Sequence, residues 1–183
     1  AAFVKMNAMT DENNQSRLLE EIELPLARVL ASMEREGFFV DAEGIDKFGT
    51  ELYGRIQTLV AEIYESVGYE FNLNSPKQLG EALFVKMGLP AKKKTKSGYS
   101  TNAEVLEGLA ADYPVVAKIL EYRTLAKLKS TYCDGLLKVI GDDGRIHSTL
   151  NQTETRTGRI SSAEPNLQNI PVRTTVGKEL RKF

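Results

Sequence analysis

The segment from residue 151 to residue 173, NQTETRTGRISSAEPNLQNIPVR, is dense in side chains that recognise other molecules. Three of its amide side chains, which offer both donors and acceptors, lie close together at Asn166, Gln168 and Asn169. Its arginines, which are planar donor forks suited to phosphates or base edges, are Arg156, Arg159 and Arg173. A polar loop whose side chains satisfy one another has the same composition. The residue types alone therefore leave open both a binding surface and an ordinary polar loop.

The order of these residues is more specific than their types. TRTGRISSAEPNLQNIPVR resembles the T-G-R-L-S-S-x-x-P-N-L-Q-N-I-P-[IV]-R segment of family A DNA polymerases, the family of bacterial DNA polymerase I. The resemblance extends upstream through IELPLARVLASMEREGFFVD, FNLNSPKQLGEALFVKMGLP and ILEYRTLAKLKSTYCDGL. It implies that the chain is a DNA-binding fragment of a DNA-directed DNA polymerase, whose intact parent performs template-directed nucleotidyl transfer in replication and repair.

The resemblance also implies roles for individual residues. Arg159 would reach the minor groove at the primer end, where every correct base pair presents acceptors. Asn166, Gln168 and Asn169 match positions near the primer-template junction, and Arg173 matches an arginine near the primer backbone. For Asn166 and Asn169, side-chain bonds that only shape the loop are the alternative interpretation.

Two positions depart from the family pattern by introducing charge. Glu154 and Arg156 replace residues that are usually small, and Ile160 is a milder change from leucine. Arg156 either assists DNA binding or pairs with Glu154, and the sequence does not decide between these.

The resemblance places the catalytic metal ligands outside this chain. Polymerases hold two divalent metals with carboxylates, and the family motifs that supply them would follow Phe183. We therefore expect no catalytic residue, no metal ligand and no bound cofactor here, an inactive isolated chain, and Mg²⁺ in the intact parent.

Cysteine and histidine chemistry is limited because each residue occurs once. Cys133 can form no internal disulfide, and with His147 it cannot complete a zinc cage. We expect Cys133 to pack in a helix, and we expect a structural role for His147, since no carboxylate partner is identified near it. No secretory signal or membrane-spanning run is found, and a reducing cytoplasm fits this usage.

Helical periodicity dominates the elements that must position these side chains. Apolar spacing predicts helices over 16–37, with a kink or break at Pro25, and over 45–67, with Asp41 as N-cap and Gly68 as the stop. Capping boxes at Ser75 with Gln78 and at Thr101 with Glu104 predict two more helix starts.

A further long helix is predicted from Pro114 to about residue 140, followed by a strand over 145–150. Its polar, mostly cationic side offers phosphate contacts, with a solvated face as the alternative. The candidate DNA contacts on this helix are Arg123, Lys127, Lys129, Ser130 and Thr131.

Two other places suit phosphates. The helix start at residues 72–75 contributes Asn72, Asn74 and Ser75, where helix capping also explains the residues. The basic loop AKKKTKSGYS contributes Lys92, Lys93, Lys94 and Lys96.

The fold class expected is mainly α with minor β, a long-helix thumb plus an incomplete palm. Its expected divisions are 1–15, a linker or the tail of an exonuclease-type domain; 16–43, a palm-associated helix and strand; 44–140, the thumb; and 141–183, the start of the palm.

Charge separates along the chain in a way that suits an anionic partner. Residues 10–65 carry 13 acidic and 5 basic side chains, whereas residues 66–183 carry 12 acidic and 18 basic. The expected partners are primer-template duplex DNA and the remainder of the polymerase, with no membrane, in a monomer. The alternatives are a freestanding helical duplex-DNA-binding module without catalysis and a helical protein-interaction domain.

Overall fold

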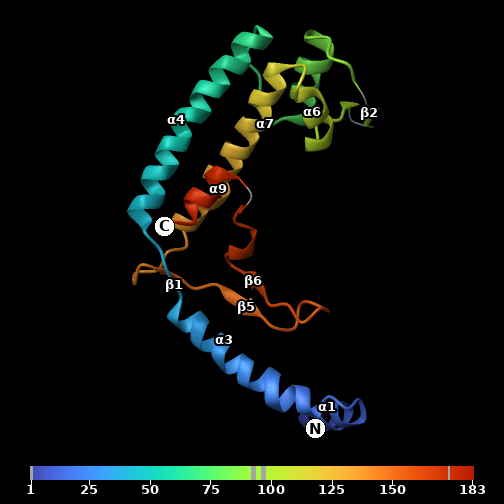
Figure 1. The fold of residues 1–183 in the computed structure, drawn as a ribbon, viewed down its shortest axis with the longest axis vertical. Helices are drawn as coiled ribbons and strands as arrows, with labels where there is room; N and C mark the ends of the chain where they lie inside the picture. Colours follow the sequence, from blue (N-terminus) through green and yellow to red (C-terminus); the bar gives the residue numbers. More distant parts are fainter. Residues whose placement is uncertain (1, 92–93, 96–97, 173) are drawn as a thin grey trace.

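Two long antiparallel helices lie side by side, with a small β region at their base and a helical arm beyond it (Figure 1). The computed structural model describes residues 2–91, 94–95, 98–172 and 174–183, and at 94 and 95 it describes the backbone alone. The expectation of a mainly α fold with minor β is confirmed. Along the described part of the chain, no helix has the length and apolar character needed to cross a membrane.

The N-terminal arm is helical. Its elements are α1 (Ala2–Glu12), α2 (Ser16–Leu18), the π-helical turn η1 (Leu19–Glu23) and α3 (Leu24–Glu36). The interruption predicted at Pro25 takes the form of the wider turn η1 directly before it, because a proline ring clashes with the carbonyl four residues earlier in a regular α-helix. Among the described residues of this arm, only Leu30 is buried.

The two long helical stretches form a rod, which we call the two-helix rod. Its members are α4 (Ala42–Val67) and the continuous stretch of α7 (Pro114–Lys127), the π-helical turn η3 (Leu128–Cys133) and α8 (Asp134–Leu137). Asp41 caps α4 by accepting from the Gly44 N–H at 2.9 Å, and α4 ends at Gly68, whose φ is +89°. Both ends of α4 are as the sequence predicts.

The far end of the rod carries short helices. They are α5 (Pro76–Gly80), the π-helical turn η2 (Glu81–Lys86) and α6 (Ala103–Ala110), with the hairpin β2 (Lys94–Thr95) and β3 (Gly98–Tyr99) beside them. Ser75 caps α5 as predicted, but Gln78 reaches back to the N–H of Asn72 and not of Ser75.

The predicted capping box at Thr101 is wrong. Asn102 caps α6 by accepting from the Val105 N–H at 3.0 Å. Thr101 is buried, and both its carbonyl and its hydroxyl accept from the guanidinium of Arg123. A partner 22 residues away in the sequence has taken the group that local chemistry would use as a cap.

The base of the rod holds the remaining elements. β1 (Phe38–Phe39) pairs antiparallel with β4 (Arg145–Ile146), and β5 (Thr149–Asn151) pairs antiparallel with β6 (Ser161–Ala163). The single strand predicted over 145–150 is thus two strands in different sheets. The chain continues through the short 3-10 helix η4 (Leu167–Asn169) to α9 (Thr175–Leu180).

The core lies mainly between the helices of the rod and under α6. It combines an apolar stripe on α4 with the facing stripe on the α7 stretch. Its fully buried large side chains include Ile45, Leu59, Ile63, Leu79, Leu83, Leu106, Val116 and Ile119. Gly49 faces Cys133 at the base, where an added Cβ would lie 3.4 Å from the Cβ of Cys133, an ordinary van der Waals contact.

Candidate nucleic-acid interface

The loop between β5 and β6 presents two arginines to solvent. Arg156 and Arg159 are exposed, and Gly158, whose φ is +74°, lets the chain turn between them. The hydroxyl of Thr155 donates to the carbonyl of Arg159 at 2.5 Å and closes the loop. Among the described side chains, neither Arg156 nor Glu154 takes part in an ion pair, so the two do not pair with one another.

Residues 165–169, which we call the amide turn, have amides with different free ends. The Asn166 side-chain oxygen accepts from the Gln168 N–H at 3.0 Å, which leaves its NH₂ as a donor. The Gln168 NH₂ donates to the Ile160 carbonyl at 2.7 Å, which leaves its oxygen as an acceptor. Asn169 is exposed, and its side-chain amide bonds no other residue that the structure describes. The loop-shaping interpretation therefore holds for Asn166, and the DNA contacts of all three amides stay predictions.

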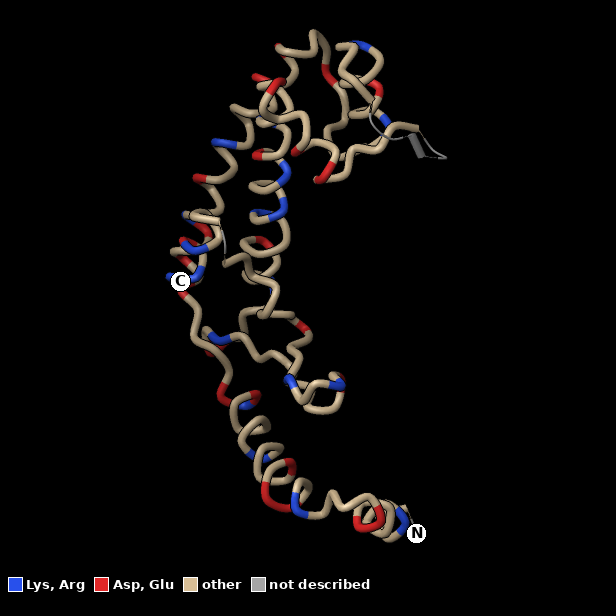
Figure 2. The backbone as a smooth tube through the Cα atoms, turned by 45° about the vertical axis from the view of Figure 1, so that its right-hand side comes forward, with Lys and Arg blue, Asp and Glu red and all other residues tan. Residues whose placement is uncertain are grey.

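The amide turn meets the cationic side of the long helix. Lys127 and Thr131 line a hollow of about 630 Å³ together with Asn166 and Asn169. We call it the junction hollow, and its remaining lining residues are Tyr132, Gly135, Leu136 and Pro165. Figure 2 shows basic positions along α7 and in the loop between β5 and β6. Residues 35 or more positions apart in the sequence thus share one concave surface.

A second hollow lies toward the far end of the rod. Ser75 and Arg123 line about 580 Å³ with Tyr99, Ser100 and Asn102. Burial lowers the pKa of Arg123, whose guanidinium bonds Thr101 at 2.5 and 3.3 Å. Asn72 and Asn74 shape the adjoining helix start, with the Asn72 oxygen accepting from the Asn74 N–H and the Asn74 oxygen accepting from the Tyr122 hydroxyl.

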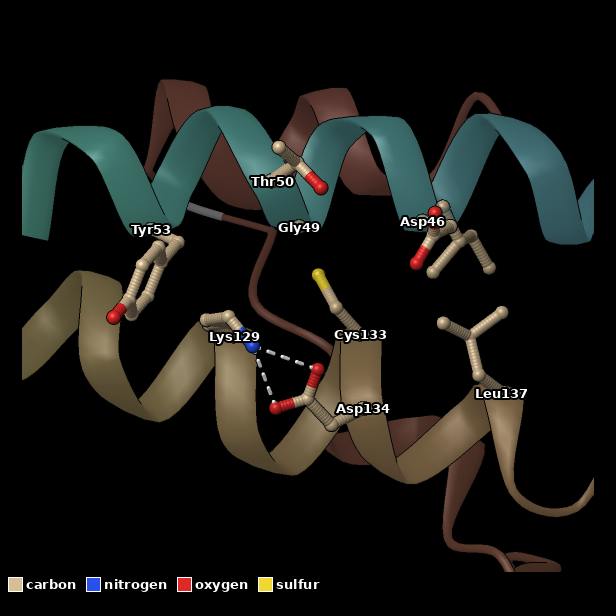
Figure 3. Close-up of a pocket in the computed structure, with 9 residues that line it drawn as sticks. Asp46, Gly49, Thr50, Tyr53, Lys129, Cys133, Asp134 and Leu137 are labelled. Carbon is tan, nitrogen blue, oxygen red and sulfur yellow. Dashed lines mark hydrogen bonds and ion pairs between the residues drawn. The ribbon is translucent and has the colours of Figure 1, made fainter.

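Lys129 lies apart from Lys127. Its ammonium pairs with the Asp134 carboxylate at 2.9 Å and stands 5.8 Å from the centre of the Tyr53 ring, in a hollow of about 280 Å³ between α4 and η3 (Figure 3). Cys133 is buried in the same place, and burial raises the pKa of its thiol to about 11. The thiol therefore stays protonated, as expected of a packing residue.

The other candidate DNA contacts are Ser130, four lysines of the basic loop and Arg173. Ser130 is exposed on η3. Lys92, Lys93, Lys96 and Arg173 lie outside the described residues, and Lys94 is described only as backbone in β2. The DNA contacts predicted for all these residues stay predictions.

The sequence as a whole matches a known family. The model of DNA polymerase family A matches residues 42–183. The chain belongs to DNA polymerase family A. DNA polymerase I of Lactococcus lactis subsp. cremoris (strain MG1363) is 54% identical over 178 residues, which cover 97% of this chain and 20% of the relative. DNA polymerase I of Geobacillus stearothermophilus is 53% identical over 171 residues, which cover 93% of this chain and 20% of that relative.

A solved structure of the family has the same fold. It is the POL domain of Pol1 from M. smegmatis in complex with DNA primer-template and dNTP, with a TM-score of 0.84, 42% identity, and coverage of 94% of this chain and 30% of that one. The family resemblance seen in the sequence is thereby confirmed. This family A chain spans about a fifth of the length of the curated relatives it matches.

The described part of this family A chain contains no cluster of side chains that could bind the catalytic metals. Among the described residues, no three of the histidine, cysteine, aspartate and glutamate side chains gather where they could hold a metal ion. The residues present therefore do not fit a two-metal centre, and we derive no step of nucleotidyl transfer from them.

Three residues of this family A chain were missed by sequence reasoning. Ser148 and Ser162 are buried and bond one another, and the Tyr132 hydroxyl donates to the Asn169 carbonyl. In the sequence, Tyr132 stands among the apolar positions of the long helix, and the serines carry no local signal because their pairing depends on the β5–β6 register. A hydroxyl within an apolar stripe is the one cue that the sequence offered for Tyr132.

His147 ties the arm to the β region, and the expectation that no carboxylate accompanies it is wrong. Its two ring nitrogens lie 2.8 Å from the Glu34 carbonyl and 3.0 Å from the Asp143 carboxylate. Both neighbours are acceptors, so only the protonated ring donates to both. The bond to the Glu34 carbonyl, and then the bond to Asp143, raises the pKa of His147 above its ordinary value.

We expect this shift to make stability depend on pH. Because the folded pKa is raised, the contribution is fully present below the unfolded pKa of about 6.5 and is lost as the pH rises through the folded value. An NMR titration of His147 should give a pKa above that reference, and Asp143→Asn should lower it. Asp142→Asn, next in sequence, is the matched control, and an equal shift in both variants would contradict the assignment.

Proposed function

We propose that this chain is the DNA-gripping part of a family A DNA polymerase. In this proposal residues 44–140 are the thumb, 141–183 begin the palm, 16–43 are the palm-associated helix and strand, and 1–15 are a linker or the tail of a preceding exonuclease-type domain. The observation that carries the proposal is the junction hollow, where Lys127 and Thr131 from the helix stand with Asn166 and Asn169 from the amide turn.

The chemistry of the hollow suits a duplex of any sequence. An exposed lysine attracts phosphates whatever the bases. Every base pair presents N3 or O2 acceptors in the minor groove, and the free NH₂ of Asn166 and the guanidinium of Arg159 are donors. A surface of this kind favours correctly formed pairs without preferring a sequence, as copying requires. The high identity to DNA polymerase I over nearly the whole chain favours this proposal over a freestanding module.

The remainder of the polymerase is the second proposed partner. Apolar side chains on α2, η1 and α3 are exposed, and these are Leu18, Ile22, Leu24, Val29 and Met33. A large exposed apolar patch usually marks a surface that contacts another part of a protein. We propose that the intact parent carries out template-directed nucleotidyl transfer in replication and repair, uses Mg²⁺, works as a monomer and resides in the cytoplasm.

A salt titration of primer-template binding tests the proposal. We expect the logarithm of the association constant of the 183-residue chain to fall linearly with the logarithm of salt concentration, because bound lysines release counterions. Lys127→Ala should make the slope shallower by about one. Fluorescence anisotropy of a labelled primer-template gives both quantities.

The control for this titration is Lys47→Ala. Lys47 is exposed on α4 and lines neither of the two hollows proposed to meet DNA. It should leave the slope unchanged. Absence of binding by the unmodified chain at low salt would contradict the proposed function.

A further inference from the structure

A chain of hydrogen bonds encloses Asn166. The Leu167 N–H donates to the Ser162 hydroxyl at 3.1 Å, the hydroxyls of Ser162 and Ser148 lie 2.7 Å apart, and the Ser148 hydroxyl donates to the Pro165 carbonyl at 2.8 Å. The backbone groups on both sides of Asn166 are therefore tied to the same two side chains. We call Ser148 and Ser162 the serine pair.

The serine pair lies where water does not compete. Ser148 is 1% exposed and Ser162 is 6% exposed. Each hydroxyl has one proton. The Ser148 hydroxyl lies 2.8 Å from the Pro165 carbonyl and 3.1 Å from the Ala163 carbonyl, and the Ser162 hydroxyl also lies 3.1 Å from the Pro165 carbonyl. Both protons therefore have acceptors within this cluster, and among the described residues no buried side-chain nitrogen or oxygen lacks a partner.

The other end of the amide turn is fixed by the helix. The hydroxyl of Tyr132, a residue 7% exposed on η3, donates to the Asn169 carbonyl. Tyr132 follows Thr131, so the anchor comes from the same turn of helix as the candidate phosphate contacts. The turn is held at Pro165 and Leu167 by the serine pair and at Asn169 by Tyr132, while its amides point outward.

We propose that Ser148, Ser162 and Tyr132 are positioning residues for DNA binding. They set where the Asn166 and Asn169 amides stand relative to Lys127 across the junction hollow, so that amide and phosphate contacts form on one duplex together. The inference rests on the proposed function. It adds that affinity depends on three hydroxyls whose hydrogen bonds are made within the protein.

The reason is the cost of ordering. A turn that is fixed before binding does not lose its freedom on binding, whereas a turn released from its anchors must be ordered by the DNA. Phosphate contacts from Lys127 do not need the turn. Loss of an anchor should therefore weaken binding while the number of released counterions stays the same.

The experiment compares Tyr132→Phe and Ser162→Ala with the unmodified chain in primer-template binding across salt concentrations. We expect affinity about tenfold weaker, in line with the loss of a buried hydrogen bond, and an unchanged salt slope. Ser162→Thr keeps the hydroxyl and should restore binding. Ser161→Ala, the neighbouring position on β6 outside the serine pair, should bind like the unmodified chain.

The outcomes separate the two proposals. Circular dichroism identifies a temperature at which each variant is folded, and binding is compared at that temperature. If Ser162→Ala does not fold, Tyr132→Phe still tests the inference, because phenylalanine keeps the packing of the ring. Affinity of Tyr132→Phe equal to that of a DNA-binding unmodified chain overturns the inference and leaves the proposed function intact, as does a shallower salt slope with unchanged low-salt affinity. If the unmodified chain binds no primer-template, both fall.

Discussion

Leu59→Ala should lower the free energy of unfolding by about 3 kcal/mol, because it removes a large side chain from a fully enclosed site. Leu59 is 0% exposed and lies on the face of α4 that packs against α7. The backbone hydrogen bonds of both helices keep them rigid. The side chains around Leu59 can therefore fill the cavity left by the substitution only in part. Urea denaturation followed by circular dichroism measures the change.

The same substitution at an exposed leucine is the control. Leu24, in the arm, is 53% exposed, so Leu24→Ala should change the free energy of unfolding by only about 0.5 kcal/mol or less. Equal losses in the two variants would mean that the α4–α7 interface is not the core of this protein.

Gly177→Ala should loosen α9 by about 1 to 3 kcal/mol, the usual cost of an overpacked site. A Cβ at Gly177 would lie 2.6 Å from the Pro171 carbonyl oxygen and 2.7 Å from the Pro171 Cβ. The oxygen is backbone and cannot move aside like the end of a flexible side chain. Hydrogen exchange should show faster exchange of the α9 amides in the variant.

Gly54→Ala adds the same methyl group but should raise the free energy of unfolding. Gly54 is exposed within α4, and a Cβ there meets nothing within 4 Å. Alanine is a better helix former than glycine by about 1 kcal/mol, so this variant should be the more stable protein. Stabilisation by Gly177→Ala as well would show that the close approach to Pro171 is absent in solution.

Local chemistry predicted the helix ends that use neighbouring residues. Asp41 marks the start of α4 because its carboxylate caps an N–H three residues later. Gly68 marks the end of α4 because glycine readily adopts the positive φ found there. The cap of α6 was assigned to the wrong residue because Thr101 accepts hydrogen bonds from Arg123, which lies 22 residues away in the sequence. Patterns within a short window do not contain such a partner.

The site was predicted by residue type but not by orientation. In the sequence, Arg123, Lys127 and Lys129 group as candidate DNA contacts on the polar side of the long helix. The turn η3 is wider than an α-helical turn, which changes the direction of the residues after it, and Asp134 faces α4 together with Lys129. The free ends of Asn166 and Gln168 also depend on bonds within the folded turn.

The two-helix rod is also a lever. Its helices pack through a shared apolar core and are joined in the half away from the base by the ion pairs Arg55–Glu121 and Lys118–Glu62, so we expect the rod to turn as a unit about its base. The 26 residues of α4 give the rod a length of about 39 Å, so a rotation of about 5° at its base would move its tip by about 3 Å. A small adjustment beside β1 and β4 is thereby magnified at the far hollow, on the scale of one base-pair step.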